Sequence, residues 1–307
     1  LTRRPIGSAE GLEPLAVDIR YALPESEQIF VTDEVRPLQS CTRCVRDLPV
    51  DEDHGPYPLI FFVHGTASWR MQSLSLMEHW ASRGFVVVAA DHPGLFLADM
   101  LSFACGEDPS GEQDLLGDLN SLHGALESGT PSLAFLSGLV DVERAAVFGH
   151  SAGGNAAAAA AGLSGVRVIG SLASGRAVDL DGWTGTSLFA GGLSDAIVNF
   201  SQTESAYEET LGSKRLIGIE GAGHLVFSDI CQITNDQGQN LVEIATAAGV
   251  CGTEFASFLF DCAANEIPSA ASDRILKRAS TWVLFQSDVR CRRCQPLLGQ
   301  VLQALVR

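Results

Sequence analysis

The sequence predicts an α/β fold with a mostly parallel central sheet. From residue 58 onwards, short apolar runs alternate with longer helical patterns, which is the order of elements in βαβ units. The apolar runs are continuous, as expected of parallel strands that are covered on both faces. The chain has 307 residues, 46% of them hydrophobic, which is enough for a sizeable core. We expect one domain over 1–307, because α/β folds of this length are routinely single.

Strands and helices are expected in alternation. The strands are expected at 59–63, 85–90, 144–148, 166–173, 186–192 and 215–221. The helices are expected near 71–83, 113–127, 152–162, 201–210 and 272–286. Two weaker strand patterns, at 16–23 and 27–35, are assigned to an antiparallel edge. The segments 98–112 and 230–271 fit no regular element, so we expect them to be lid or loop segments that cover the site.

Charge and hydropathy exclude two classes of function. Acidic side chains outnumber basic ones by 37 to 20, and the formal charge of -17 would repel phosphate backbones and anionic lipid. Nucleic-acid binding is therefore not expected. The longest apolar runs fall well short of the ~20 residues that span a bilayer, so no transmembrane segment is expected either. The chain begins without a Met and without an apolar signal-peptide region, which suggests a processed or trimmed start.

The cysteines indicate an oxidising compartment. There are eight: Cys41, Cys44, Cys105, Cys231, Cys251, Cys262, Cys291 and Cys294. An even count this high favours disulfides and a secreted or periplasmic protein. Free thiols are one alternative, and a zinc ion held by the CxxC pairs at 41–44 and 291–294 is another. The pairs lie near opposite ends of the chain, whereas zinc ribbons space theirs by ~15 to 20 residues, so we expect no metal.

The strongest motif is GHSAG, Gly149 to Gly153, between a predicted strand and a predicted helix. A nucleophile elbow requires a strand, a sharp turn and a helix, with small residues two before and two after the serine. Gly149 and Gly153 meet that requirement and make Ser151 the candidate nucleophile. The alternative is that Ser151 merely caps the helix.

Chain order then indicates the partners of this serine, because the acid and the histidine follow the nucleophile in folds of this kind. His224 is the one histidine after Ser151, and it directly follows the last predicted strand. The acidic residues considered between them are Asp179, Asp181, Asp195, Glu204, Glu208, Glu209 and Glu220. Asp195 immediately follows a strong strand, so we assign it as the acid. Asp229 comes after the histidine and is expected to brace its loop.

An oxyanion hole needs two backbone N–H groups. One is expected from Ala152, directly after the nucleophile, and the other from Thr66 in the sequence HGTASWR, where Gly65 allows a tight approach. An ordinary strand-to-helix turn is the alternative for HGTAS. Trp69 and Trp183 are candidates for the aromatic walls of a substrate pocket, and core packing is the alternative for each.

These segments resemble a known group. PYPLIFFVHGTASWR, SRGFVVVAADHPG, VFGHSAGGNAAA, GGLSDAIV and GAGHLVFSD are similar to α/β-hydrolases of the group that holds predicted dienelactone hydrolases, platelet-activating-factor acetylhydrolase-like enzymes and polyester hydrolases. The resemblance covers roughly 14–287. It implies a serine carboxylesterase with Ser151, Asp195 and His224 as triad and Thr66 and Ala152 as oxyanion donors, without a metal or organic cofactor. True dienelactone hydrolases carry a cysteine in the elbow, so the resemblance supports the fold more than that lactone.

The leading hypothesis is therefore a monomeric serine esterase for small to medium acyl esters, with polyesters as a further substrate class. The triad residues do not separate an esterase from a serine peptidase or amidase of the same fold. A non-catalytic binding protein with this fold is a third hypothesis. It predicts a broken triad, whereas all three residue types are present.

Overall fold

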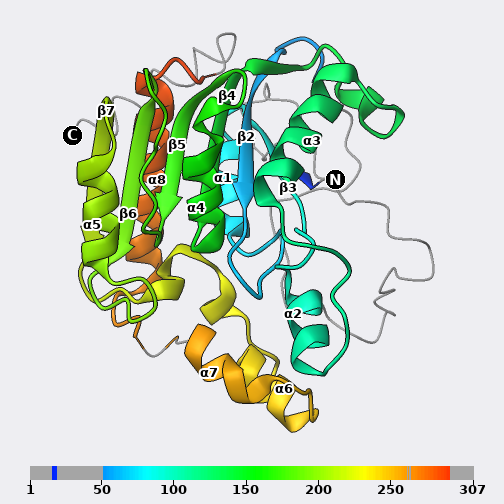
Figure 1. The fold of residues 1–307 in the computed structure, drawn as a ribbon, viewed down its shortest axis with the longest axis vertical. Coiled ribbons are helices and arrows are strands. Elements are labelled where there is room, and N and C mark those ends of the chain that lie inside the picture. The colour runs from blue at the N-terminus through cyan, green and yellow to red at the C-terminus, as the bar shows by residue number, and fades with distance from the viewer. Residues whose placement is uncertain (1–15, 19–50, 261, 263, 291–307) are drawn as a thin grey trace.

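A computed structural model describes residues 16–18, 51–260, 262 and 264–290. It contains a seven-stranded sheet in the order β1-β3-β2-β4-β5-β6-β7, and every neighbouring pair is parallel (Figure 1). The strands are β1 (Ala16–Asp18), β2 (Tyr57–Val63), β3 (Val86–Ala89), β4 (Val140–His150), β5 (Val166–Leu172), β6 (Thr186–Gly192) and β7 (Ser213–Ile219). The predicted α/β class with a parallel central sheet is confirmed.

The six strands expected after residue 58 are all present. β2, β3 and β6 are buried along their whole length, which is why their sequences are continuous apolar runs without polar alternation. β4 begins four residues before its predicted start, because its first half is partly exposed and carries the charged sequence Val140–Glu143. Its buried half matches the predicted run.

The expected antiparallel edge is wrong for its first strand. β1 pairs with β3 in parallel, with Val17 opposite Val88. The connection from β1 to β2 is longer than the dozen or so residues that a parallel crossover needs, so no hairpin forces these strands to run in opposite directions. The second expected strand, 27–35, lies outside the described residues.

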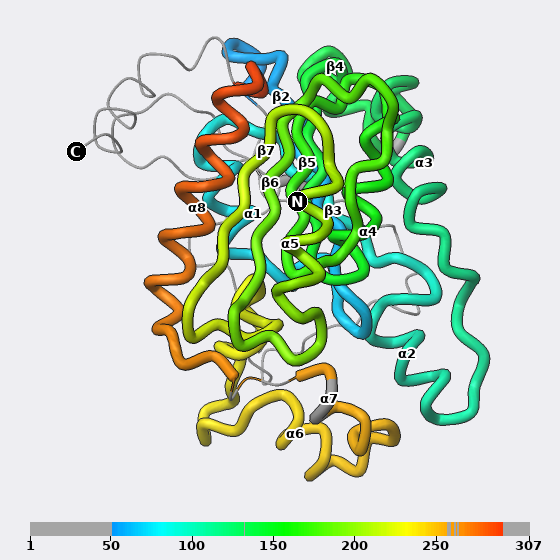
Figure 2. The backbone as a smooth tube through the Cα atoms, turned by 60° about the vertical axis from the view of Figure 1, so that its left-hand side comes forward, coloured from blue at the N-terminus to red at the C-terminus, as the bar shows by residue number. Residues whose placement is uncertain are grey.

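Helices cover both faces of the sheet (Figure 1, Figure 2). One face carries α1 (Leu74–Ala81) and α8 (Ser269–Gln286), and the other carries α3 (Leu115–Ser128), α4 (Ala152–Ala159) and α5 (Phe200–Glu209). All five occupy the regions predicted to be helical. No helix in the described part of the chain is long and apolar enough to cross a bilayer.

The two segments expected to lack regular structure contain short helices instead. These are α2 (Leu97–Ala104), α6 (Leu241–Ala247) and α7 (Ala256–Leu259), with single turns of 3-10 helix between them. Helices of four to eight residues span too few turns for a clear periodic pattern. A capping box, in which Asn240 and Glu243 each bond to the other's backbone N–H, marks the start of α6.

Two disulfides fix these segments, and both fit the prediction from the cysteine count. Cys105 at the end of α2 pairs with Cys251, between α6 and α7, and Cys231 pairs with Cys262. The described cysteines include no free thiol. Cys41, Cys44, Cys291 and Cys294, on which the zinc alternative depends, lie outside the described residues.

Close packing of α4 on the sheet explains its small residues. Ala156, Ala157 and Ala158 are buried, and a Cβ atom at Gly153 would overlap the backbone carbonyl of Val63 at the end of β2. A backbone oxygen in a buried strand cannot move aside without disturbing the sheet. The helix can therefore begin directly against the strand only because residue 153 has no side chain.

We predict that Gly153→Ala lowers the free energy of unfolding by about 3 kcal/mol or more, because the added methyl group overpacks the strand end. Gly124→Ala is the control, since nothing lies within 4 Å of a Cβ atom at this exposed position in α3. That change should stabilise the protein by about 0.5–1 kcal/mol. Urea unfolding measures both, and equal effects of the two substitutions would contradict this account of the packing.

Candidate active site

Ser151 lies at a sharp turn between β4 and α4. Its backbone has φ 58° and ψ -119°, whereas β4 ends at His150 and α4 begins at Ala152. A non-glycine residue in this region stores about 1–3 kcal/mol of strain, which persists only where the surrounding structure enforces it. A Cβ at Gly149 would overlap the backbone of Gly153, so both glycines are needed for the turn to close. This is the strained strand-to-helix turn that GHSAG predicts.

His224 and Asp195 form a buried pair at the same edge of the sheet. Asp195 follows β6, and His224 begins the turn after β7. Nδ1 of His224 lies 2.8 Å from Oδ2 of Asp195, and the carboxylate's Oδ1 accepts hydrogen bonds from the backbone N–H groups of Ile197 and Val198 at 2.8 and 2.9 Å. An ionised carboxylate only accepts, so the proton of this bond sits on Nδ1 and leaves Nε2 as an acceptor.

Ser151 is connected to this pair through its neighbour in the chain. The ring of His150 packs against the ring of His224, with 4.7 Å between the centroids. Among the hydrogen bonds of the described residues, none joins the Ser151 hydroxyl to His224. Such bonds are often long before substrate binds. The structure thus brings the three predicted residues to one edge of the sheet, with the histidine and the acid already paired.

The loop after β2 approaches the serine closely. A Cβ atom at Gly65 would lie 3.2 Å from the Cβ of Ser151 and 3.0 Å from Nδ1 of His150, so a larger residue would crowd the turn. Thr66 follows Gly65, and Ala152 is the first residue of α4, where N–H groups have no partner within the helix. Both candidate oxyanion donors therefore belong to segments that flank Ser151.

Gln72, in the loop between β2 and α1, links the loops of the site. Its Oε1 accepts from the Gly65 N–H at 2.7 Å, and its Nε2 donates to Nδ1 of His150 at 2.6 Å. Nε2 of His150 then donates to the carbonyl oxygen of His224 at 2.9 Å. Because the Gly65 N–H can only donate, it fixes which end of the Gln72 amide faces His150, and with it the His150 tautomer. Three buried hydrogen bonds thus join the loop after β2, the Ser151 turn and the loop that carries His224, which we call the histidine loop.

Burial keeps two histidines of the site neutral. Burial, and to a smaller extent the nearby His224, lower the pKa of His150 to about 3. Burial and the neighbouring His92 lower the pKa of His64 to about 3 as well. Nδ1 of His64 donates to the carbonyl of Gly65, and its Nε2 accepts from the His92 N–H. Each ring uses one nitrogen as donor and one as acceptor, which only the neutral form can do.

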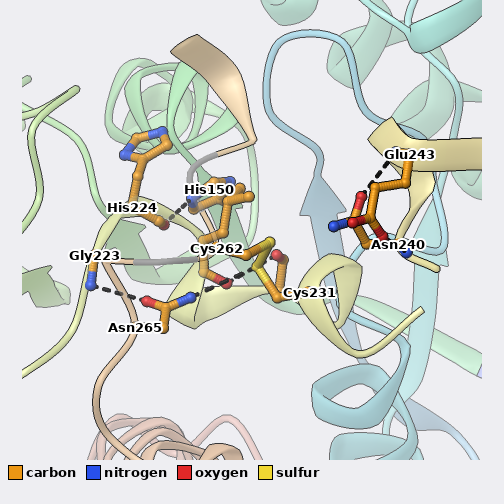
Figure 3. Close-up of a disulfide and its surroundings, with 10 residues drawn as sticks. His150, Gly223, His224, Cys231, Asn240, Glu243, Cys262 and Asn265 are labelled. Carbon is orange, nitrogen blue, oxygen red and sulfur yellow. Dashed lines mark hydrogen bonds between the residues drawn. A yellow bond between two sulfur atoms is a disulfide. The ribbon is translucent and has the colours of Figure 1, made fainter. Parts of the chain in front are cut away.

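The Cys231–Cys262 disulfide supports the histidine loop through Asn265 (Figure 3). Asn265 accepts a hydrogen bond from the Gly223 N–H at 2.9 Å, and its side-chain amide lies 3.6 Å from the sulfur of Cys231. Cys231 is bonded to Cys262, whose carbonyl accepts from the Asn265 N–H. The residue before His224 is therefore held by a segment that the disulfide fixes.

Asp229 lies in the position expected of a brace. Its carboxylate accepts from the backbone N–H and the hydroxyl of Ser75 at 2.8 and 2.6 Å, in the first turn of α1. Its own N–H donates to the carbonyl of Gln72. Burial raises the pKa of this carboxyl, although the bonds from Ser75 oppose the shift. Asp229 thus ties the histidine loop to α1 and makes no bond to His224.

The two tryptophans lie in different places. Trp69 is half-buried in the loop after β2, where its carbonyl accepts from the N–H of Gln72. Trp183 is buried before the start of β6, where its indole N–H donates to Ser187 at 3.2 Å. Asp195 follows the opposite end of that strand, about 20 Å away for seven residues. The structure does not bring Trp183 to the site, and core packing accounts for its position.

Sequence motifs assign no role to three residues of the site. Gln72 and Asn265 act through side-chain amides that long-range contacts place, and no spacing marks them. His150 is part of GHSAG, but the motif assigns no role to that position. The signal that could have found it is its place directly beside the serine in a buried strand, where an imidazole must find two hydrogen-bond partners.

The parallel sheet and the strained serine turn are those of the α/β-hydrolase fold, and comparison with known families agrees. The model of the chlorophyllase family matches residues 42–187. The match spans slightly less than half of the chain and includes Ser151, whereas Asp195 and His224 lie beyond it. No curated protein matches the chain. The chain therefore has the α/β-hydrolase fold that its sequence indicates, and the match supports a hydrolase of the esterase type.

We predict that Gln72→Leu lowers the free energy of unfolding by about 2 kcal/mol or more, because it leaves the Gly65 N–H and Nδ1 of His150 buried without partners. Gln202→Leu, on the exposed surface of α5, is the control and should change stability by less than about 0.5 kcal/mol. Urea unfolding of the two variants tests this. A Gln72→Leu protein as stable as the control would show that the chain of hydrogen bonds does not support the site.

Proposed function

We propose that this protein is a serine carboxylic ester hydrolase that works through an acyl-enzyme. The observation that carries the proposal is the strained Ser151 turn, which shares a sheet edge with a histidine fixed by a buried carboxylate. The side chain of a merely capping serine would make a hydrogen bond to the first turn of α4, and the side chain of Ser151 makes none. The candidate substrates are small to medium acyl esters, and polyesters are a further class.

In the proposed mechanism His224 acts as the general base. Nε2 takes the hydroxyl proton of Ser151 as the oxygen attacks the ester carbonyl, and Asp195 stabilises the imidazolium that forms. The N–H groups of Thr66 and Ala152 bind the oxyanion of the tetrahedral intermediate. His224 then returns the proton to the leaving alcohol. Water, deprotonated by the same nitrogen, attacks the acyl-enzyme and releases the acid and Ser151.

The proposal extends to the surroundings of the site. Trp69 is a candidate wall of the substrate pocket, because it lies in the loop after β2 that also carries Thr66. Two disulfides in the described residues support a secreted or periplasmic location. We further propose a monomer formed by one domain. Peptidase or amidase activity is the alternative that the same triad would allow, and paired ester and amide substrates separate the two.

We predict that Ser151→Ala lowers kcat for p-nitrophenyl acetate by on the order of 10⁶ and leaves the fold intact. The expected loss follows from removal of the nucleophile, and circular dichroism with urea unfolding checks the fold. A serine-directed inhibitor should label the wild type at this residue, as mass spectrometry would show. Turnover by Ser151→Ala at a tenth of the wild-type rate would disprove the assignment.

We predict that Asp195→Asn lowers kcat by about 10⁴. Oδ1 of residue 195 accepts two backbone N–H bonds, so the amide NH₂ of the variant would face His224 and force its Nδ1 to accept. The proton would then sit on Nε2, which could no longer act as base. Asp229→Asn is the matched control, since it still offers Ser75 an acceptor. If kcat falls further in Asp229→Asn than in Asp195→Asn, the acid has been misassigned.

A further inference from the structure

An apolar cavity of about 500 Å³ lies between α2 and the α6–α7 segment. All three helices lie beyond the end of the sheet that carries the candidate site (Figure 1, Figure 2). Leu101 and Met100 line the cavity from α2, and Ile244 and Ala245 line it from α6. Thr253 is the one polar side chain among the described residues that line it, and its hydroxyl already donates to the carbonyl of Val250.

The cavity reaches the loop after β2 that carries Thr66. Ala67, which also lines it, follows Thr66, and consecutive Cα atoms are 3.8 Å apart. Ala67 is itself buried and is held by a hydrogen bond from its N–H to the carbonyl of Leu95. A group bound in the cavity would therefore lie next to the backbone that we propose as an oxyanion donor.

The other end of the cavity is open at the surface. Phe103 and Phe255 line the cavity and are 70% and 61% exposed. One comes from α2 and the other from the turn before α7, so they lie on opposite walls. An apolar ligand entering between them would cover surface that is now in contact with water.

A covalent bond holds the two walls together. Cys105 at the end of α2 is bonded to Cys251, and a Cβ atom at the neighbouring Gly252 would lie 2.7 Å from the Cβ of Ala104. The walls therefore touch at this point and stay joined, while the space beside it remains. Interiors of proteins are normally filled to near crystal density, so an apolar space of this size next to a site points to a ligand.

We propose that this cavity binds a linear hydrocarbon chain of the ester substrate. The proposal rests on the proposed esterase function and deepens it, because it selects esters that carry one chain of about eight or more carbons over esters such as ethyl acetate, in which both chains are short. Cavity walls without free polar groups offer no hydrogen bond or ion pair to a charged or hydroxylated substrate. Each methylene group moved from water to such a site, by contrast, strengthens binding about fourfold. The same chain could belong to the acyl or the alcohol part of the ester.

The kinetic test compares ethyl acetate, ethyl octanoate and octyl acetate in a pH-stat. One of the two esters with an eight-carbon chain should exceed ethyl acetate in kcat/KM by at least 30-fold, and which one does so identifies the side of the ester that enters the cavity. Ala245→Trp fills the cavity from α6 and should remove at least tenfold of that preference, with less than a twofold change for ethyl acetate. Leu101→Trp fills the cavity from the opposite wall and should have the same effect. If one of the two variants fails to fold, the other still tests the proposal.

Ala247→Trp is the matched control, because Ala247 is exposed on the same helix and does not line the cavity. It should leave the preference unchanged. Equal kcat/KM values for the three esters in the wild type, or the same loss in Ala247→Trp as in Ala245→Trp, would overturn the proposal. Unfolding curves should confirm that each variant compared is folded.

A binding test separates this proposal from the esterase function. 11-(Dansylamino)undecanoic acid is titrated into the Ser151→Ala protein, which needs no turnover to report occupancy. Fluorescence should rise on binding, and Ala245→Trp in the same background should weaken the affinity at least tenfold, whereas Ala247→Trp should not. If no ester is hydrolysed but this pattern holds, the esterase function fails and the cavity site stands. If Ala245→Trp binds the probe as the parent does, the cavity site fails whatever the activity.

Discussion

The buried amide of Gln72 is the point on which the geometry of the site depends. Parallel strands bring their carboxyl ends to one edge of the sheet, but the loops that follow them are separate in sequence and need a connection. Gln72 supplies it by accepting from Gly65 and donating to His150, which in turn bonds to the carbonyl of His224. Each partner is buried, so breaking any of these bonds leaves a polar group without water. That cost gives the three loops one common arrangement.

The same constraint explains why His150 belongs in the turn beside Ser151. A neutral imidazole offers one donor and one acceptor in a fixed plane, which suits the Gln72 amide on one side and the His224 carbonyl on the other. Burial disfavours its charged form, so the arrangement does not change near neutral pH. The ring that supports the site is thus kept out of proton transfer, which the proposed mechanism assigns to His224.

Much of the fold could be predicted from the sequence because its signals are local. The buried strands are continuous apolar runs, and GHSAG specifies a turn that only glycines allow. The sequence does not predict the direction of β1 or the presence of the short helices α6 and α7. Long connections and contacts between distant residues determine both. Within the site, the pairing of Asp195 with His224 follows from chain order. The roles of Gln72 and Asn265 cannot be predicted from chain order, because they depend on atoms that come into contact only in the folded chain.

The Cys105–Cys251 bond has a consequence for how the protein is made. Its two cysteines are 146 residues apart, and β4 to β7 lie between them in the chain. During synthesis Cys105 therefore cannot form its disulfide until the residues of the sheet have been synthesised. Cys41 and Cys44 precede it in the sequence and are already present as competing thiols. Thiol–disulfide exchange must then correct any premature pair. Recombinant production should consequently favour a host compartment that contains a disulfide isomerase over oxidation in air after lysis.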